Sequence, residues 1–558
     1  MSNTKKSNPN SNTNAAIGKT SSPERDPNST GKFSCWLKED VVINPFDFIV
    51  AEHIKGTKTV GIVSEILSIS DAASHLSNYV SSDFGEPSAE PYVERLSSMV
   101  AEANVLRNTG FEKDGRVTEI FMPIPGDRKV YFADEKDIRL AIGTDLILGT
   151  EIPAGVIYQS NGTIVPVTLD SEYTLGPEGS HVNASGISGL ATKTSYLMFL
   201  LLSISQRLSD KVAFVIFNVK QADLLHIDEK GDSLNAEDIR LYNLLGLECK
   251  PFENVRYFLP PGPGGRPDSD SPPRNYESYA YTLADVYSRF DLLFADVPDP
   301  YFTLDTFNTR VREDWDNGQL IIQSQNPARR GQMAIPTVVR NWDDLKAVGN
   351  DLLVQAYNLH PVTPPRIKRE LNRLTSSPLF VNNRSPGQVY LGTRIRDIRA
   401  GDVFVVDIAR VPTRTQPFIV GDVMRSIDQM YREGESDLPN KLVILIDELN
   451  SFAPAGSSTA ITEQIVEIAR KGRSRGTILF GAEQFKSEIH EQIVGNSSIH
   501  AIGRTGSAEI RRSAYAFLDQ KSKQNVMALQ KGEIVLSTPT WRSPIKIRFP
   551  RPPYKLLK

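Results

Sequence analysis

Short apolar runs separated by glycine and proline fill residues 33–169 and predict a small β-barrel. The runs lie at residues 41–43, 48–50, 60–63, 117–121 and 156–158. Their β-branched and aromatic residues favour strands, and closely spaced short strands are typical of a barrel. Within this part, residues 92–106 place apolar side chains near helical spacing and predict a helix. The region contains no catalytic constellation of residues, so we expect it to act in assembly.

From residue 170 onward, continuous β-branched runs alternate with helical patterns. Strands are expected at 212–217, 255–259, 402–408, 441–448 and 477–482, and helices at 194–208, 235–246, 418–432 and 460–472. Fully apolar strands that alternate with helices indicate a parallel sheet covered on both faces. The predicted fold class of residues 170–545 is therefore α/β.

Two segments interrupt this alternation. Residues 260–276 form a loop rich in proline and glycine, and residues 280–380 are mostly helical in pattern. We interpret residues 280–395, approximately, as a helical insertion in the sheet domain. The insertion carries basic clusters that are either solvated helix faces or DNA contacts: Arg329 and Arg330, and Arg366, Lys368, Arg369 and Arg373.

Composition narrows the class of protein. With 558 residues and 40% apolar content, the chain is long enough for two to four domains. The net charge is −4, but residues 501–558 carry twelve Lys and Arg against three Asp and Glu. This basic part either attracts nucleic acid or an acidic neighbouring subunit, or is only a solvated surface. We expect its last residues, 546–558, to form a basic, proline-rich tail.

The polar start of the chain and its few cysteines indicate a soluble, cytoplasmic protein. Residues 1–32 are rich in Ser, Asn, Thr and Lys, so we predict disorder and no secretory signal there. Cys35 and Cys249 have no disulfide or metal-ligand spacing. The longest apolar run, residues 197–204, is far shorter than the roughly 20 residues that cross a bilayer.

Residues 181–195 carry the first candidate chemistry. A loop of small residues ends in Lys-Thr-Ser and leads directly into an apolar helical run. Backbone N–H groups and the helix dipole would bind a phosphate there, the lysine would add charge, and the adjacent hydroxyl would bind Mg²⁺. The alternative is a Gly/Ser turn before a buried helix with an incidental lysine. The candidate nucleotide-binding residues are Gly186, Ser188, Gly189, Ala191, Thr192, Lys193, Thr194 and Ser195.

Two further motifs favour nucleotide hydrolysis over that alternative. The apolar strand at 441–448 ends in Asp447 and Glu448, at the edge where α/β sheets bind ligands. One carboxylate would hold Mg²⁺ together with Thr194, and the other would orient or deprotonate water. Gln484 ends the next strand and is placed to sense a γ-phosphate, while Arg473 or Arg475 could reach a neighbouring subunit's nucleotide, their alternative role being surface ion pairing.

In their order along the chain and in their amino-acid sequence, these motifs resemble those of the HerA branch of the HerA/FtsK ATPases. The similarity covers about residues 38–550 and is most specific in Leu-Val-Ile-Leu-Ile-Asp-Glu-Leu-Asn, in Gly-Arg-Ser-Arg-Gly-Thr-Ile-Leu-Phe-Gly-Ala-Glu-Gln, and at Asn496. The resemblance implies a RecA-like P-loop NTPase core with a helical insertion, following an N-terminal barrel of the HAS type. It also implies a hexameric ring that uses ATP and Mg²⁺ to move double-stranded DNA, in company with a NurA-like nuclease or a defence effector.

Carried over by position, the resemblance makes Lys193, Thr194 and Asp447 nucleotide and Mg²⁺ ligands, Glu448 the catalytic carboxylate, Gln484 the sensor and Arg473 the trans arginine finger. Three features depart from the family pattern. The lysine loop has one extra residue and Thr192 in place of its last glycine, His181 lies where a basic residue facing a neighbour's nucleotide is expected, and Phe-Lys-Ser-Glu-Ile follows Gln484. A nucleotide-binding ring scaffold with little turnover is therefore the second hypothesis, and a secretion motor the third.

Overall fold

The computed structural model describes residues 15–81, 83–88, 96–113, 115–187, 193–221, 223–232, 234–295, 297, 303–323 and 336–557. The chain divides into two compact units, one of Met1–Asp170 with Ile502–Phe549 and one of Ser171–Ala501 with Pro550–Lys558. The predicted boundaries of the ATPase core, 170–545, therefore differ from the second unit, because residues 502–549 group with the N-terminal unit.

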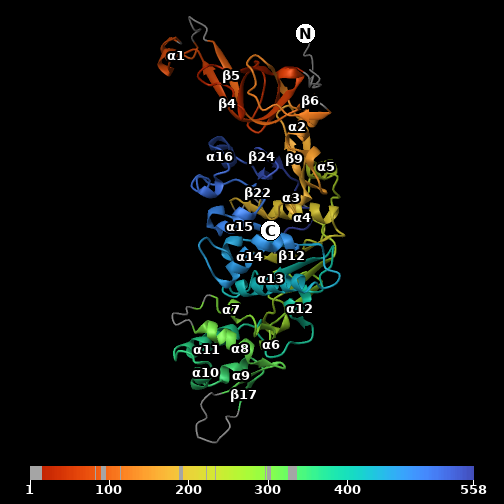
Figure 1. Ribbon diagram of the computed structural model, residues 1–558, viewed down its shortest axis with the longest axis vertical. Helices are drawn as coiled ribbons and strands as arrows, with labels where there is room; N and C mark the ends of the chain where they lie inside the picture. The colour runs from red at the N-terminus through yellow and green to blue at the C-terminus, as the bar shows by residue number, and fades with distance from the viewer. Residues whose placement is uncertain are drawn as a thin grey trace. The chain divides into compact units, whose positions relative to one another are not determined.

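A closed barrel forms the first unit's core (red to orange in Figure 1), in the strand order β1-β2-β5-β4-β3-β8. Its interior is packed with apolar side chains, among them Phe33, Ile49 and Ala101, each 0% exposed. The predicted N-terminal barrel is confirmed. Its strands are β1 (Gly18–Ser21), β2 (Lys32–Leu37), β3 (Phe48–Glu52), β4 (Lys58–Ser70), β5 (Ser97–Asn108) and β8 (Lys129–Phe132).

The helix predicted at 92–106 is wrong, because its described part belongs to strand β5. Alternate side chains of this strand point into the barrel, so that Ala101 and Ala103 are fully buried. β5 pairs antiparallel with β4 and with β2, which satisfies its backbone on both sides. Cross-strand partners far away in sequence thus override the apparent helical spacing. Residues 92–95 lie outside the described residues.

The disorder predicted for residues 1–32 is wrong for residues 15–32, whereas residues 1–14 lie outside the described part. β1 is polar, but it pairs with β2 and β8, and the Thr20 hydroxyl donates to the Pro125 carbonyl at 2.7 Å. Two predicted strands also change: residues 41–43 form a loop in which only Ile43 is buried, and residues 117–121 contribute only the end of β7 (Arg116–Thr118).

Further elements complete the first unit. Strands β10, β9, β24 and β23 pair in that order, and Lys521 of α16 forms ion pairs with Glu65 and Glu102 next to the barrel. The predicted strand at 156–158 is the end of β9. These elements are β6 (Phe111–Lys113), β9 (Glu151–Tyr158), β10 (Ile164–Asp170), β23 (Glu533–Ser537), β24 (Ile545–Arg548), α1 (His75–Ser81), α2 (Glu135–Ala141) and α16 (Gln520–Met527).

A largely parallel sheet organises the second unit, in the order β22-β11-β21-β20-β12-β19-β13-β14-β18. All seven residues of β12 and of β21 are buried, so helices cover both faces, as predicted. The strands are β11 (Val182–Ser185), β12 (Val212–Asn218), β13 (Val255–Leu259), β14 (Tyr276–Tyr279), β18 (Gln388–Val389), β19 (Val403–Asp407), β20 (Lys441–Asp447), β21 (Thr477–Glu483) and β22 (Ile499–Ile502).

The order of these strands defines the fold class. β21 lies between β11, which leads into the lysine loop, and β20, which ends in Asp447. This is the order of a RecA-like P-loop ATPase core, and it confirms the predicted class. The helices between the strands are α3 (Ser171–Thr174), α4 (Lys193–Arg207), α5 (Ala236–Leu244), α13 (Gln416–Glu433), α14 (Ala460–Arg475) and α15 (Glu491–Asn496).

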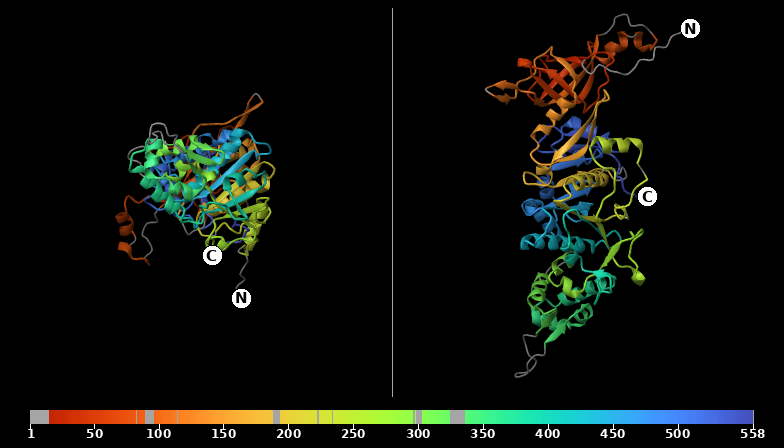
Figure 2. Two further views of the ribbon diagram at one scale, coloured as in Figure 1. Left: turned by 90° about the horizontal axis from the view of Figure 1, so that it is seen from below. Right: turned by 90° about the vertical axis from the view of Figure 1, so that its right-hand side faces the viewer.

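The insertion between β14 and β19 is helical, as predicted, and also contains a small antiparallel sheet, β15-β16-β17 (green in Figure 2). Aromatic side chains such as Phe290, Phe307 and Trp342 form its core. Its elements are α6 (Leu283–Val286), α7 (Phe290–Leu293), α8 (Leu304–Glu313), β15 (Trp315–Asp316), β16 (Gln319–Ile322), β17 (Thr337–Val339), α9 (Trp342–Ala347), α10 (Asn350–Tyr357), α11 (Thr363–Leu374) and α12 (Leu391–Ile395). Arg329 and Arg330 lie outside the described residues.

The predicted C-terminal tail is packed rather than loose. Tyr554 is 1% exposed and its ring lies against Phe252. Arg551 forms an ion pair with Asp238 at 2.7 Å, and Lys555 pairs with Glu229 at 2.8 Å. Burial of an aromatic ring and two ion pairs therefore hold the last residues against the second unit.

Candidate nucleotide-binding site

The candidate site lies at the carboxyl edge of the parallel sheet. β11, β20 and β21 end together there, since Ala482 is in register with both Ala184 and Asp447. Ligands of open α/β sheets bind at this edge. The same edge therefore brings the lysine loop and the Asp447-Glu448 pair together, although more than two hundred residues separate them in sequence.

Lys193 and Thr194 begin α4, the helix that follows the loop. The Thr194 hydroxyl donates to Asp447 Oδ2 at 3.1 Å. Upstream, Gly186 has a φ of 155° and its N–H donates to the Glu483 carbonyl at 3.2 Å. Ser195 is half-buried in the first turn of the helix. The other loop candidates, Ser188, Gly189, Ala191 and Thr192, lie outside the described residues.

Lys193 is buried at the helix N-terminus, with 6% of its surface exposed. Its ammonium makes no hydrogen bond within the described part of the chain. Burial lowers the pKa of this ammonium, and the carboxylates of Asp447 and Glu448 oppose that shift. A buried cation without a hydrogen-bond partner at a helix N-terminus is suited to an anionic ligand such as a phosphate.

Asp447 and Glu448 differ in their surroundings. Asp447 is 8% exposed and accepts from the Glu448 N–H at 3.0 Å as well as from Thr194. Glu448 adopts left-handed backbone angles, φ 57° and ψ 48°, and its side chain forms an ion pair with Lys220. Such angles cost free energy in a residue other than glycine and cluster at functional sites. Burial raises the pKa of the nearby Asp223, and the negative charge of Asp447 adds to this rise.

The oxygen donors present fit a magnesium ion. Thr194 Oγ1 and the Asp447 carboxylate already touch, and Mg²⁺ prefers hard oxygen ligands and retains several waters. No cluster of three or more His, Cys, Asp or Glu side chains suited to a metal occurs among the described residues. A metal at this site would therefore depend on oxygens of the nucleotide as well as on the chain.

A buried ionisable cluster beside Lys193 was missed by the sequence analysis. Glu483, the last residue of β21, is 0% exposed, and its charged neighbours are Lys486 and Lys193. Burial raises the pKa of Glu483 and lowers the pKa of Lys486, although each charge opposes the shift of the other. Lys486 Nζ lies 2.8 Å from Nδ1 of His500, whose pKa burial lowers to about 3. The one sequence signal was a glutamate at the end of an apolar strand with a lysine three residues later.

The predicted sensor follows this cluster. Gln484 directly succeeds β21 and is half-buried at the same edge as Asp447. The strand register therefore brings Gln484 to the edge of the candidate site.

The predicted arginines lie at the opposite edge of the sheet. Arg473 and Arg475 end α14 just before β21 begins, whereas Lys193 lies beyond the end of that strand. Seven residues at about 3.3 Å each separate the two edges by roughly 20 Å. Neither arginine reaches the candidate nucleotide site within the same chain.

The two arginines also differ from each other. Arg473 donates only to the Glu178 carbonyl, at 3.1 Å, among the described residues. Arg475 is tied to Asp428 at 2.5 Å and to Glu467 at 3.4 Å. Arg475 therefore has the surface ion-pairing role, and Arg473 keeps its guanidinium free of carboxylates in the described structure.

His181 is not available to a neighbour's nucleotide. It is 1% exposed, and its Nδ1 accepts from the Leu479 N–H at 2.9 Å. Burial lowers the pKa of His181 to about 4, so the ring is neutral near pH 7. His181 therefore does not supply the basic contact that the family pattern has at this position, because its ring is part of the core between β11 and β21.

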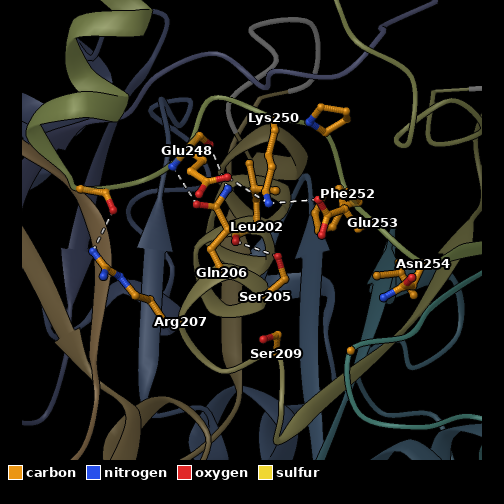
Figure 3. Close-up of a pocket in the computed structure, with 14 residues that line it drawn as sticks. Leu202, Ser205, Gln206, Arg207, Ser209, Glu248, Lys250, Phe252, Glu253 and Asn254 are labelled. Carbon is orange, nitrogen blue, oxygen red and sulfur yellow. Dashed lines mark hydrogen bonds and ion pairs between the residues drawn. The ribbon is translucent and has the colours of Figure 1, made fainter.

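A cavity of about 310 Å³ lies at the amino edge of the sheet, beside the end of α4 (Figure 3). Several of its polar side chains are already paired, among them Gln206 with the backbone of Glu248, and Lys250 with Glu248 at 2.9 Å and Glu253 at 3.0 Å. The cavity is remote from Lys193 and Asp447, so it is separate from the candidate nucleotide site.

The structure is an α/β core with the strand order of RecA-like P-loop proteins, and a β-barrel precedes this core in the chain. No helix among the described residues is long and apolar enough to cross a membrane. No family model matches the chain, and no curated protein matches it.

Several solved structures are similar to this chain at low identity. A bacterial conjugative coupling protein, TrwB, is 11% identical over 75% of this chain and 94% of its own, with a TM-score of 0.41. VirB4 of Thermoanaerobacter pseudethanolicus is 13% identical over 72% of this chain and 96% of its own, with a TM-score of 0.42. The genome packaging NTPase B204 of Sulfolobus turreted icosahedral virus 2 is 12% identical over 28% of this chain and 70% of its own, with a TM-score of 0.22.

Proposed function

We propose that this protein is an ATP-dependent motor of the HerA type that moves double-stranded DNA. The observation that carries the proposal is the convergence of Lys193 and Thr194, at the head of α4, with Asp447 at the end of β20, where Thr194 and Asp447 are 3.1 Å apart. A lysine, a hydroxyl and two carboxylates at one sheet edge are the groups that phosphoryl transfer from ATP requires.

Each residue then has a distinct role. Lys193 and the first N–H groups of α4 bind the phosphates, and Thr194 with Asp447 holds Mg²⁺. When bound, this ion neutralises charge on the phosphate oxygens. Glu448 orients the attacking water and accepts its proton, for which it must leave its ion pair with Lys220. Gln484 senses the γ-phosphate from the neighbouring strand.

A ring of subunits completes the proposed site. Arg473 lies at the sheet edge opposite its own Lys193, so we place it against the nucleotide of the next subunit, where it stabilises transition-state charge. A hexamer, double-stranded DNA as the substrate, and a NurA-like nuclease or defence effector as the partner come from the resemblance to HerA.

The second candidate function is a ring scaffold that binds nucleotide but turns it over slowly. Two observations favour it: Thr192 replaces a loop glycine, and Lys220 holds Glu448 in an ion pair. Steady-state ATP hydrolysis of the wild type and of Glu448→Gln, each with duplex DNA, separates the two functions. A motor requires a wild-type rate far above that of the variant. Equal rates would overturn the motor and leave the scaffold.

A further inference from the structure

Helix α11 of the insertion presents a row of arginines next to a buried apolar face. Ile367, Leu371 and Leu374 are at most 4% exposed and anchor the helix in the insertion core. Arg366, Arg369 and Arg373 follow one another at intervals of three and four residues, so their side chains share one side of the helix.

These arginines line a cavity of about 310 Å³. Arg414, which precedes α13 in a distant part of the sequence, enters the same cavity. Leu292, Leu293 and Pro417 supply apolar wall. Two separate segments thus bring four guanidinium groups to one hollow, which we call the arginine pocket. An ordinary solvated helix face does not require such convergence.

Two arginines of the pocket have no close carboxylate partner among the described residues. Glu370 is the single carboxylate among the described lining residues, and it pairs with Arg373 at 2.8 Å and more loosely with Arg369 at 4.0 Å. The Arg414 side chain makes no ion pair or hydrogen bond with any described residue. Arg369 and Arg414 therefore bring positive charge to the pocket that no described residue closely pairs, which favours an anionic ligand.

We propose that the arginine pocket binds backbone phosphates of duplex DNA, a contact that rests on the proposed motor function. Arginine binds phosphate oxygens through two parallel N–H groups, with geometry that lysine does not offer. The side chains of Arg369 and Arg373 are 73% and 41% exposed, so the pocket faces outward and suits an extended polyanion better than an enclosed small molecule. The apolar wall accommodates the deoxyribose.

The ligand chemistry predicts binding without sequence preference. Contacts to phosphate and sugar position DNA but do not read its bases. Each phosphate contact also releases counterions, so affinity falls as salt rises. The pocket would therefore hold DNA against the insertion while the motor advances, whatever the sequence.

Fluorescence anisotropy with a short labelled duplex tests this assignment on the full chain, from about 50 to 200 mM salt. The test variant is Arg369→Gln/Arg414→Gln. The matched control is Lys368→Gln/Arg240→Gln, which removes the same charge from α11 and from α5 outside the pocket. We expect the test variant to bind more weakly and to lose about 0.9 from the salt slope per phosphate contact removed, and the control to lose less.

A second variant and a competitor distinguish the sources of binding. Arg369→Lys/Arg414→Lys keeps the charge but not the forked geometry and should recover only part of the affinity. Inorganic phosphate at the same ionic strength should not displace the duplex, because a single phosphate cannot reproduce several contacts. Equal affinity and salt slope in test and control variants would overturn the pocket assignment while the motor stands. A wild-type protein that binds no duplex would overturn both.

Discussion

Thr194 donates a hydrogen bond to Asp447 at 3.1 Å, which joins residues 253 positions apart at the head of α4 and the end of β20. Both atoms are oxygens of the kind that bind Mg²⁺. The hydrogen bond therefore holds the two proposed metal ligands close together before any metal binds. It also ties the helix to the central strand, so the local packing and the proposed chemistry depend on the same pair.

Replacing this hydroxyl should separate its two roles. Thr194→Val keeps the shape of the side chain but loses the donor, whereas Thr194→Ser keeps the hydroxyl. We expect the valine variant to lose about 10–100-fold in apparent Mg²⁺ affinity for ATP hydrolysis and only about 1 kcal/mol of unfolding free energy. Magnesium titrations of ATPase rate and thermal unfolding measure these effects. A valine variant as active as the serine variant would remove Thr194 from the metal site.

Lys193→Ala should abolish ATP hydrolysis and weaken nucleotide binding. The buried ammonium has no hydrogen-bond partner in the described structure, so its loss should affect phosphate binding more than the fold. Binding of a fluorescent ATP analogue and steady-state hydrolysis check the result, with Lys220→Ala as the control cation next to Glu448. Hydrolysis that survives in Lys193→Ala would show that residues 181–195 are not the phosphate loop.

Arg473→Ala and Arg475→Ala should fail in different ways. Arg475 is held by Asp428 and Glu467, so its loss should lower thermal stability. Arg473 pairs with no carboxylate among the described residues, so its loss should lower turnover by about a thousandfold, the scale of an arginine finger, without changing stability.

Mixed rings test whether Arg473 acts between subunits. Arg473→Ala subunits and Glu448→Gln subunits are each inactive alone if both residues are essential. Because the arginine serves the next subunit, a mixture should recover some activity at interfaces that combine an intact Glu448 with an intact Arg473. A mixture without any recovery, in rings shown to exchange subunits, would contradict the trans role.

The parallel sheet was predictable from the sequence because its strands are continuous apolar runs. Such runs are typical of a strand buried on both faces, and the positions found for β12, β19, β20 and β21 match the prediction closely. The carboxyl edge of the sheet then determined where Asp447 and Thr194 would meet. The local sequence pattern was enough to predict these strands, because a continuous apolar run indicates a buried strand whichever strand lies beside it.

The barrel strands were less predictable because their stability is not local. β5 has near-helical apolar spacing, and only its pairing with β4 and β2 makes it a strand. β1 is polar and gains its order from neighbours on both sides. Glu483 was missed because a glutamate is rarely buried, and only the tertiary fold brings the opposing charges of Lys486 and Lys193 near it.

The buried groups Glu483 and Lys486 should make unfolding depend on pH in the wild type. Between their ordinary pKa values, 4.5 and 10.5, the unfolded chain carries one proton on these two residues, on the lysine. Burial raises the pKa of the glutamate to about 8, so below that pH the folded protein holds an additional proton, and burial lowers the pKa of the lysine to about 7, so above that pH the folded protein loses the lysine proton. Stability should therefore fall as pH rises from 4.5 to about 7, where only the glutamate's proton count differs between the two states.

Lys486→Met should isolate the contribution of Glu483 to this slope. The folded variant keeps a proton on the buried Glu483, because burial raises its pKa and the opposing charge of Lys486 is gone, while the unfolded chain ionises above pH 4.5. The contribution to stability is thus intact below pH 4.5 and is lost as pH rises toward the raised folded pKa, by about 1.4 kcal/mol per pH unit. Thermal unfolding between pH 5 and 8 measures the slope relative to the double variant Glu483→Gln/Lys486→Met. The double variant should lack this slope, since the remaining titratable group is removed. A single variant whose slope equals that of the double variant would show that Glu483 is ionised in the folded protein without its lysine.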